Sequence, residues 1–106
     1  MKKIKTDICV IGGGSGGLSV ASGAVQMGAR VVLIEKGKMG GDCLNAGCVP
    51  SKALLHAAKE GMDYADAMEH VQNTIATIAP HDSQERFEGL GCTVIREHAR
   101  FTSPKT

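Results

Sequence analysis

The chain has 106 residues, which is enough for one domain at most. Its 12 Lys and Arg residues balance 11 Asp and Glu residues, and its aromatic residues are one Tyr and two Phe. Neither a basic surface for nucleic acid or an anionic membrane nor a set of rings for stacking bases is therefore predicted. No apolar run approaches the roughly 18 residues that a membrane span needs.

The N-terminus opens with basic residues followed by apolar ones, which is also how a secretory signal begins. Asp7 and the glycine run from Gly12 interrupt that apolar stretch, and no clean cleavage site of small residues follows. We therefore expect a cytoplasmic protein without an export signal. In such a protein, four cysteines favour catalytic or metal-binding roles over a structural disulfide framework.

The first third of the chain reads as a strand, a helix and a second strand. Residues 4–11 read as a short strand, because their β-branched residues and the abrupt stop at glycine favour a buried parallel strand. The glycines of residues 12–17 predict a tight turn, residues 16–27 predict a helix that ends at Gly28, and residues 30–35 predict the second strand. The predicted fold class is therefore α/β, with a Rossmann-like β-α-β unit and a parallel sheet.

The middle of the chain predicts helices after an irregular start. Residues 36–50 begin with too much Gly, Asp and Asn for regular structure, and Pro50 suits the first turn of a helix. Strong helix formers fill residues 51–60, Gly61 weakens that helix, and a helical pattern resumes over residues 64–79.

The last third predicts a short helix and a third strand. Asp82 followed by Glu85 is a variant of the capping box, and Gly89 and Gly91 would end the helix that it starts. Residues 92–97 read as the strand. Cys9 and Cys92 are expected to be small core residues of the first and last strands. His56 is expected to be a structural or surface residue, and His70, His81 and His98 are expected to lie at the surface.

Gly12, Gly14 and Gly17 form the pattern G-x-G-x-x-G between the first strand and the first helix. The first glycine permits the turn, the second lets the backbone approach a pyrophosphate, and the third lets helix and strand pack closely. Glu35 ends the second strand, where a carboxylate can accept hydrogen bonds from ribose hydroxyls and disfavours a 2′-phosphate. The pattern predicts a dinucleotide site but does not separate FAD from NAD.

Cys43 and Cys48 lie five positions apart, within the stretch GGDCLNAGCVPSK. In a continuous helix their Cα atoms would be about 8–9 Å apart, whereas a disulfide needs about 4.4–6.8 Å. They can bridge only if the intervening residues form a loop or a distorted helix, which Asn45 and Gly47 make plausible. Zinc is a weaker alternative, because no other Cys or His pair is positioned to complete four ligands.

The two motifs, in this order and spacing, resemble the class I pyridine nucleotide-disulfide oxidoreductases, the flavoproteins that include dihydrolipoamide dehydrogenase and mercuric reductase. The resemblance is close over residues 4–56 and loose over residues 57–106. It implies a redox-active disulfide of Cys43, the interchange thiol, and Cys48, the thiol beside the flavin. It also implies a set of FAD-binding residues: Gly12, Gly14, Ser15, Gly16, Gly17, Glu35, Lys36, Gly41, Asp42 and Lys52. Lys52 would stabilise negative charge on the reduced ring.

The resemblance further implies that residues 1–106 are the N-terminal part of an FAD-binding domain. The NAD(P) and dimerisation domains, and the partner subunit's acid–base histidine, would lie outside this stretch. The full-length enzyme would be a homodimer in cell redox homeostasis that uses NAD(P)H, and the fragment alone would be inactive.

Many members of the family have Thr at the position of Asp42, which puts the substrate in doubt between a thiol or disulfide and a soft metal ion. Two rival hypotheses stay open: a non-catalytic dinucleotide-binding module with a structural disulfide, and a flavin-free thiol protein that handles metal ions.

Overall fold

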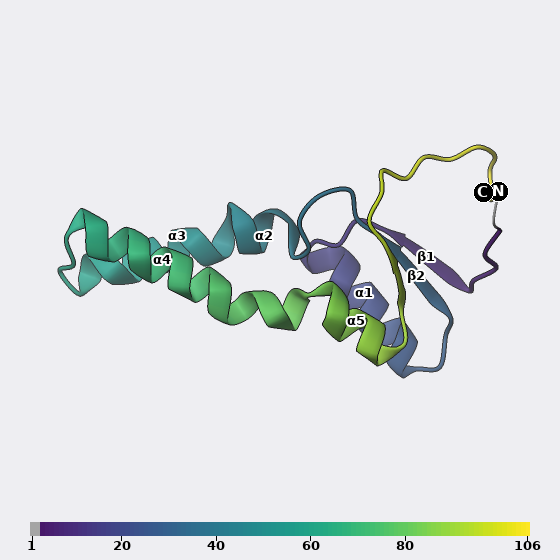
Figure 1. Cartoon of the computed structure of the whole chain (residues 1–106), viewed down its shortest axis with the longest axis horizontal. Coiled ribbons are helices and arrows are strands. Elements are labelled where there is room, and N and C mark those ends of the chain that lie inside the picture. Colours follow the sequence, from purple (N-terminus) through teal and green to yellow (C-terminus); the bar gives the residue numbers. More distant parts are fainter. Residues whose placement is uncertain (1–2) are drawn as a thin grey trace.

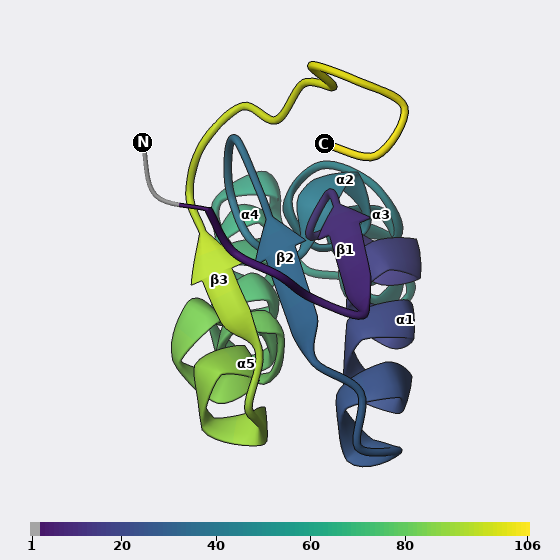
Figure 2. The same cartoon turned by 90° about the vertical axis from the view of Figure 1, so that its right-hand side faces the viewer.

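The computed structural model describes residues 3–106 of the chain. Three strands form one parallel sheet in the order β1-β2-β3, and helices α1 and α5 cover one face of it (Figure 2). The elements in chain order are β1 (Ile8–Ile11), α1 (Ser15–Gln26), β2 (Val31–Ile34), α2 (Gly41–Asn45), α3 (Cys48–Lys59), α4 (Tyr64–Ile78), the 3-10 helix η1 (Ala79–Asp82), α5 (Gln84–Leu90) and β3 (Thr93–Ile95). The predicted α/β fold class is confirmed.

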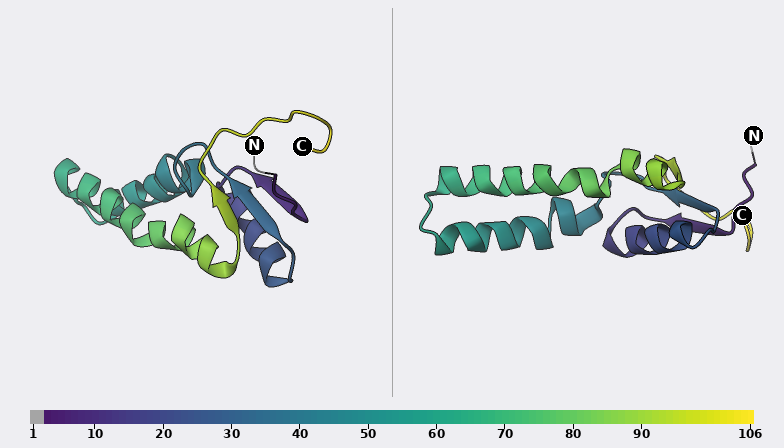
Figure 3. Two further views of the ribbon diagram at one scale, coloured as in Figure 1. Left: turned by 45° about the vertical axis from the view of Figure 1, so that its right-hand side comes forward. Right: turned by 90° about the horizontal axis from the view of Figure 1, so that it is seen from below.

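The molecule has two parts, a sheet with its covering helices and a long helical hairpin. Helices α3 and α4 extend away from the sheet as an antiparallel pair, which gives overall dimensions of 53 × 27 × 18 Å (Figures 1 and 3). The core lies between the sheet and helices α1 and α5. Its buried residues are Val10, Leu18, Ala21, Val31, Leu33, Phe87 and Cys92.

The first strand is shorter than predicted, because β1 begins at Ile8 and Ile4 lies outside it with 48% of its surface exposed. The prediction that Cys9 is a core residue is wrong, since its side chain is exposed. Successive side chains of a strand point to opposite faces. Val10 faces the covering helices and is buried, so Cys9 and Ile11 point to the face that no described helix covers. Cys92 is buried, as predicted.

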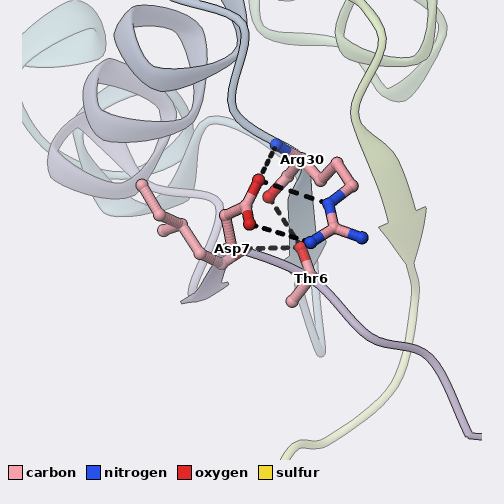
Figure 4. Close-up of polar contacts among 4 residues, drawn as sticks. Thr6, Asp7 and Arg30 are labelled. Atoms are coloured by element: carbon pink, nitrogen blue, oxygen red, sulfur yellow. Dashed lines mark hydrogen bonds and ion pairs between the residues drawn. The ribbon is translucent and has the colours of Figure 1, made fainter.

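The segment before β1 is held to the start of β2 by polar contacts (Figure 4). The Asp7 carboxylate forms an ion pair with the Arg30 guanidinium at 3.0 Å and accepts a hydrogen bond from the Arg30 backbone N–H at 2.8 Å. The Thr6 hydroxyl donates to the Arg30 carbonyl at 2.7 Å. These contacts lie beside the parallel pairing of β1 with β2, in which Ile8 is opposite Val31.

Two predictions about helix starts need correction. The start of residues 36–50 is irregular as expected, but a five-residue helix, α2, follows at Gly41, and α3 begins at Cys48 rather than at residue 51. Pro50 lies in the first turn of α3, where its missing N–H costs nothing. The cap of α5 is Ser83, not Asp82, because the Ser83 hydroxyl accepts a hydrogen bond from the Arg86 N–H at 3.2 Å.

The α3–α4 hairpin packs through small side chains. Ala53 and Ala57 of α3 and Ala67 and Val71 of α4 are buried, so the two helices approach closely. Gly61, at φ +73°, lies in the connection, and the Asp63 carboxylate caps α4 by accepting from the Asp66 N–H at 2.9 Å. Among residues 3–106, no helix has both the length and the apolar character that crossing a bilayer requires.

Candidate dinucleotide and dithiol site

The glycine turn has the close packing that its motif predicts. Gly12 has φ +110° and donates its N–H to the Ile34 carbonyl at 2.7 Å, which joins the end of β1 to the end of β2. A Cβ atom on Gly17 would lie 1.9 Å from the Gly12 carbonyl oxygen, so only glycine fits there. Gly14 precedes α1 without a side-chain cap, which leaves the first N–H groups of the helix available to an anion.

Glu35 lies at the carboxyl end of the sheet, and both of its oxygens are already hydrogen bonded. Oε2 accepts from the Gly37 N–H at 2.6 Å, and Oε1 accepts from the Gly13 N–H at 2.9 Å. The bond from Gly37 is the main cause that lowers the pKa of Glu35, and the bond from Gly13 adds to it. The carboxylate is therefore ionised and held against the glycine turn, a contact that the sequence motif did not reveal.

A cavity of about 240 Å³ opens beside this carboxylate. Its lining comes from the ends of β1 and β2 and from the segment after β3: Ile11, Gly12, Ile34, Glu35, Lys36, Glu97, His98 and Ala99. Gly12, Glu35 and Lys36 were singled out from the sequence. Residues 97–99 were missed, because nothing in a local pattern indicates that the end of the third strand would return to the first glycine turn.

A second glycine pair links this turn to the cysteines. The Gly40 N–H donates to the Gly13 carbonyl at 2.8 Å, and Gly40 and Gly41 have φ of +93° and +61°. A Cβ atom on Gly41 would lie 2.7 Å from the Gly14 Cα atom. Helix α2 therefore starts in backbone contact with the glycine turn, and this contact fixes where Cys43 lies relative to the dinucleotide motif.

The cysteines lie on either side of a break between two helices. Helix α2 ends at Asn45 and α3 begins at Cys48, so the intervening chain is not a continuous helix, as a bridge between the cysteines requires. The Asn45 amide donates to the Gly41 carbonyl at 2.9 Å and to the Met39 carbonyl at 3.2 Å, which holds the break in place.

Both cysteines are present as thiols, with Cys43 half-buried and Cys48 exposed. Hydrogen bonding with the Cys48 side chain is the main cause that raises the pKa of Cys43, and desolvation adds to it. The positive charge of Lys52 acts in the opposite direction. Lys52 follows Cys48 by one helical turn in α3, so the two thiols and this ammonium group form one electrostatic unit.

Asp42 lies exposed in the first turn of α2. At that position the positive end of the helix dipole favours a carboxylate.

A second cavity, of about 280 Å³, reaches Cys43 from the side of α1 and α5. Its lining residues are Ser15, Leu18, Ser19, Ser22, Gly40, Cys43, Asp82, Arg86 and Phe87. The sequence analysis named only Ser15 and Cys43 as site residues among these. The polar spacing of Ser15, Ser19 and Ser22 along one helix face was an available signal, but the partner residues on η1 and α5 are far away in sequence.

The described residues contain no group of three or more His, Cys, Asp or Glu side chains placed to hold a metal ion. The residues around the glycine turn do fit a dinucleotide. They combine an uncapped helix N-terminus, a turn in which no side chain lies within 4 Å of a Cβ atom built on Gly12 or Gly16, and an ionised carboxylate. The fold and the site together define an α/β segment whose glycine turn fits a dinucleotide and lies next to a cysteine pair.

Comparison with known proteins gives the same class. The family model described as "Pyridine nucleotide-disulphide oxidoreductase" matches residues 6–102, and the chain belongs to this family. Dihydrolipoyl dehydrogenase of Staphylococcus aureus is 58% identical over 55 residues, which are 52% of this chain and 12% of that protein. Its counterpart in Pseudomonas aeruginosa is 53% identical over 57 residues, 54% of this chain and 12% of that protein.

Among solved structures, the Cu(II) complex of the HOCl-induced flavoprotein disulfide reductase RclA from Escherichia coli superposes with a TM-score of 0.80. The two chains are 29% identical, and the match covers 88% of this chain and 22% of that one. The chain therefore spans about an eighth of the length of the curated relatives and under a quarter of the solved one.

Proposed function

We propose that the full-length protein carrying this sequence is an FAD-dependent NAD(P)H:disulfide oxidoreductase of the dihydrolipoamide dehydrogenase type. The observation that carries the proposal is the backbone contact between Gly41 and Gly14, because it joins the dinucleotide turn to the helix that bears Cys43. As parts of the same proposal, the enzyme is a cytoplasmic homodimer, and its nicotinamide and dimerisation domains lie outside residues 1–106.

The residues that would hold FAD are those of the glycine turn, Glu35 and the start of α2. The N–H groups at the start of α1 would bind the pyrophosphate, and Glu35 would accept hydrogen bonds from the ribose hydroxyls. Lys36 lines the cavity beside Glu35, while Asp42 and Lys52 lie near the cysteines. Bound FAD would supply two-electron transfer between a reduced nicotinamide and the cysteine pair.

The two cysteines would carry out dithiol–disulfide exchange. The Cys43 thiolate attacks one sulfur of the substrate disulfide, the substrate S–S bond breaks, and one substrate thiol leaves with a proton. The Cys48 thiolate then attacks the Cys43 sulfur, which releases the second thiol and forms the Cys43–Cys48 disulfide. The pair loses two electrons and the substrate gains them. NAD(P)H restores the dithiol, and the reverse sequence oxidises a dithiol substrate.

The charges around Cys43 indicate what each neighbouring group would do in the reaction. The raised pKa of Cys43 means that its thiol needs a base to remove the proton before attack. The resemblance assigns that base to a histidine of the partner subunit. Lys52 stabilises the thiolate once it forms. The cavity lined by α1, η1 and α5 opens on Cys43, and we assign the approach of the disulfide substrate to it.

A metal-ion reductase of the mercuric reductase type is the second candidate. The exposed Cys48 and half-buried Cys43 form an accessible dithiol, and soft thiolates bind soft metal ions. The solved relative described above is a Cu(II) complex of a flavoprotein disulfide reductase. In that case the metal ion would take its electrons from Cys43 and Cys48, so both candidate functions require a redox-active dithiol.

The decisive experiment is anaerobic titration of the full-length protein with NADH and then NADPH, followed by visible absorption. We expect a flavin spectrum that gains a long-wavelength charge-transfer band at two electrons. Cys48→Ser should retain flavin and lose the band, whereas Cys9→Ser, on the exposed face of the sheet, should change neither. A Cys48→Ser protein with an unchanged band would refute the role of Cys48, and absence of flavin would refute the proposal as a whole.

A further inference from the structure

The α3–α4 hairpin brings together two histidines that are unrelated to the dithiol site. The imidazole ring of His56 in α3 and that of His70 in α4 have centroids 5.5 Å apart and are tilted by 38°. His56 was expected to be a structural or surface residue and His70 a surface residue. In the structure His56 is exposed and His70 is half-buried, and the proximity of their rings is what the sequence did not reveal.

We propose that His56 and His70 form a binding site for a divalent transition-metal ion that joins α3 to α4. Imidazole nitrogens bind zinc at 2.0–2.1 Å, so each ring centroid would lie about 3.2 Å from the ion. Two centroids at the observed 5.5 Å then subtend about 120° at the ion, close to the tetrahedral angle. Binding would require each ring to turn so that one of its nitrogens faces the shared ion.

The backbone positions of the two histidines are rigid. His56 precedes the fully buried Ala57, and His70 precedes the buried Val71, so the closest packing of the hairpin lies directly beside each ring. The two helices are also held at their connection, where Asp63 caps α4. Two ligands on fixed helices lose little freedom on binding, which favours chelation over binding by separate surface histidines.

The charges around the pair are compatible with a cation. Lys52 and Lys59 lie within one turn of His56 in α3, whereas Glu60, Asp66 and Glu69 lie within one turn of the two rings. Acidic groups therefore outnumber basic ones here, three to two. His56 also lies in the last turn of α3, where the negative end of the helix dipole favours positive charge.

The donor set defines the class of ion. Imidazole suits zinc, copper and nickel, and a site without a carboxylate cluster does not suit magnesium or calcium. Since the described residues hold no third ligand of the His, Cys, Asp or Glu type beside the pair, water would complete the coordination. For two nitrogen ligands, affinity should rise from nickel to copper and fall again at zinc. A bound ion would cross-link α4 to the helix that begins at Cys48.

The test is metal binding by the full-length protein without an affinity tag, in a Cys9→Ser/Cys43→Ser/Cys48→Ser background that removes the exposed and half-buried thiols of residues 3–106. Titration with Cu²⁺ and with Zn²⁺ should show one ion per chain at micromolar affinity, and the Cu²⁺ spin-resonance spectrum should show nitrogen ligands. His56→Asn and His70→Asn should each weaken binding at least tenfold and by similar factors. The matched control, His81→Asn, changes an exposed histidine outside the hairpin and should leave binding unchanged.

An unchanged circular dichroism spectrum and thermal unfolding curve of each variant, measured without metal, show that the protein is folded. Absence of stoichiometric binding would overturn the proposal, as would binding that only one of the two substitutions affects. Loss of flavin–thiol coupling in the Cys48→Ser protein does not bear on this result, so the metal site and the proposed enzymatic function fail or succeed separately.

Discussion

The glycine-rich part of the molecule and the helical hairpin use opposite kinds of packing. In the first, backbone touches backbone, as where a Cβ atom on Gly41 would lie 2.7 Å from Gly14, and side chains are excluded. In the second, small buried side chains such as Ala57 and Ala67 lie between two helices, and side chain packs against side chain. The amino-acid sequence of the glycine-rich part is therefore constrained by individual atomic contacts. The sequence of the hairpin is constrained only by the size and polarity of its side chains.

The comparisons with known proteins differ in how much of the chain they cover. Identity of 58% extends over 55 residues, about half of the chain, whereas the structural match to the solved flavoprotein reductase covers 88% at 29% identity. The fold is therefore shared over more of the chain than the strongest sequence similarity covers. A fold can extend beyond the region of high sequence identity, because many different sequences pack with side chains of suitable size and polarity.

The largest effect is expected for Gly17→Ala. The added methyl group would lie 1.9 Å from the Gly12 carbonyl oxygen, a clash that only backbone movement relieves, so stability should fall by about 3 kcal/mol or more and FAD should be lost. Gly23→Ala is the control in the same helix, because nothing lies within 4 Å of its Cβ position, and it should stabilise by up to about 1 kcal/mol. Thermal unfolding and bound flavin are measured. Equal stability of the two variants would show that the turn is not tightly packed.

An intermediate effect is expected for two glycines with similar backbone conformation in the two parts. Gly41 has φ +61° and faces Gly14, whereas Gly61 has φ +73° and open space around it. Gly61→Ala should cost about 1–2 kcal/mol, from conformational strain alone. Gly41→Ala should cost roughly 1–3 kcal/mol more, because the methyl group also clashes. Denaturant unfolding of both variants measures the difference. If it is absent, the contact between α2 and the glycine turn is not tight.

The smallest effect concerns the pH dependence of Glu35. Hydrogen bonds from Gly37 and Gly13 lower its pKa in the folded protein, so the stabilisation is complete above the unfolded pKa of about 4.3. This stabilisation should be lost as the pH falls through the lower pKa that Glu35 has in the folded protein. Glu35→Gln replaces one accepting oxygen with a donor that faces a backbone N–H, so the variant should be less stable at pH 7 and approach the wild type in acid. A constant difference from pH 7 to pH 3 would contradict this assignment.

Local patterns predicted the elements that local forces determine. The order of strand, glycine turn, helix and strand was correct, as was Pro50 in the first turn of α3, because these depend on a residue's own backbone preferences. The short helix α2 was not foreseen. Its residues are poor helix formers, and it is held by the contact of Gly41 with Gly14 and by the bonds of the Asn45 side chain.

The other differences between prediction and structure arise where two adjacent residues could each cap a helix, or where segments distant in the sequence pack together. Asp82 and Ser83 are both good caps, and only the path of the chain from η1 into α5 selects Ser83. Cys9 was expected in the core from its apolar strand, but which side of that strand is covered depends on where the helices pack.

The amino-acid sequence by itself determined the parts whose chemistry is local. The glycine spacing and Glu35 predict a dinucleotide turn, and Asn45 and Gly47 indicated the break between Cys43 and Cys48 that separates α2 from α3 in the structure. Tertiary structure alone decided what separate segments build together: the backbone contact that joins the turn to α2, the cavity between α1 and α5 that reaches Cys43, and the pairing of His56 with His70. The reason is that packing between elements distant in the chain leaves no periodic signal in either one.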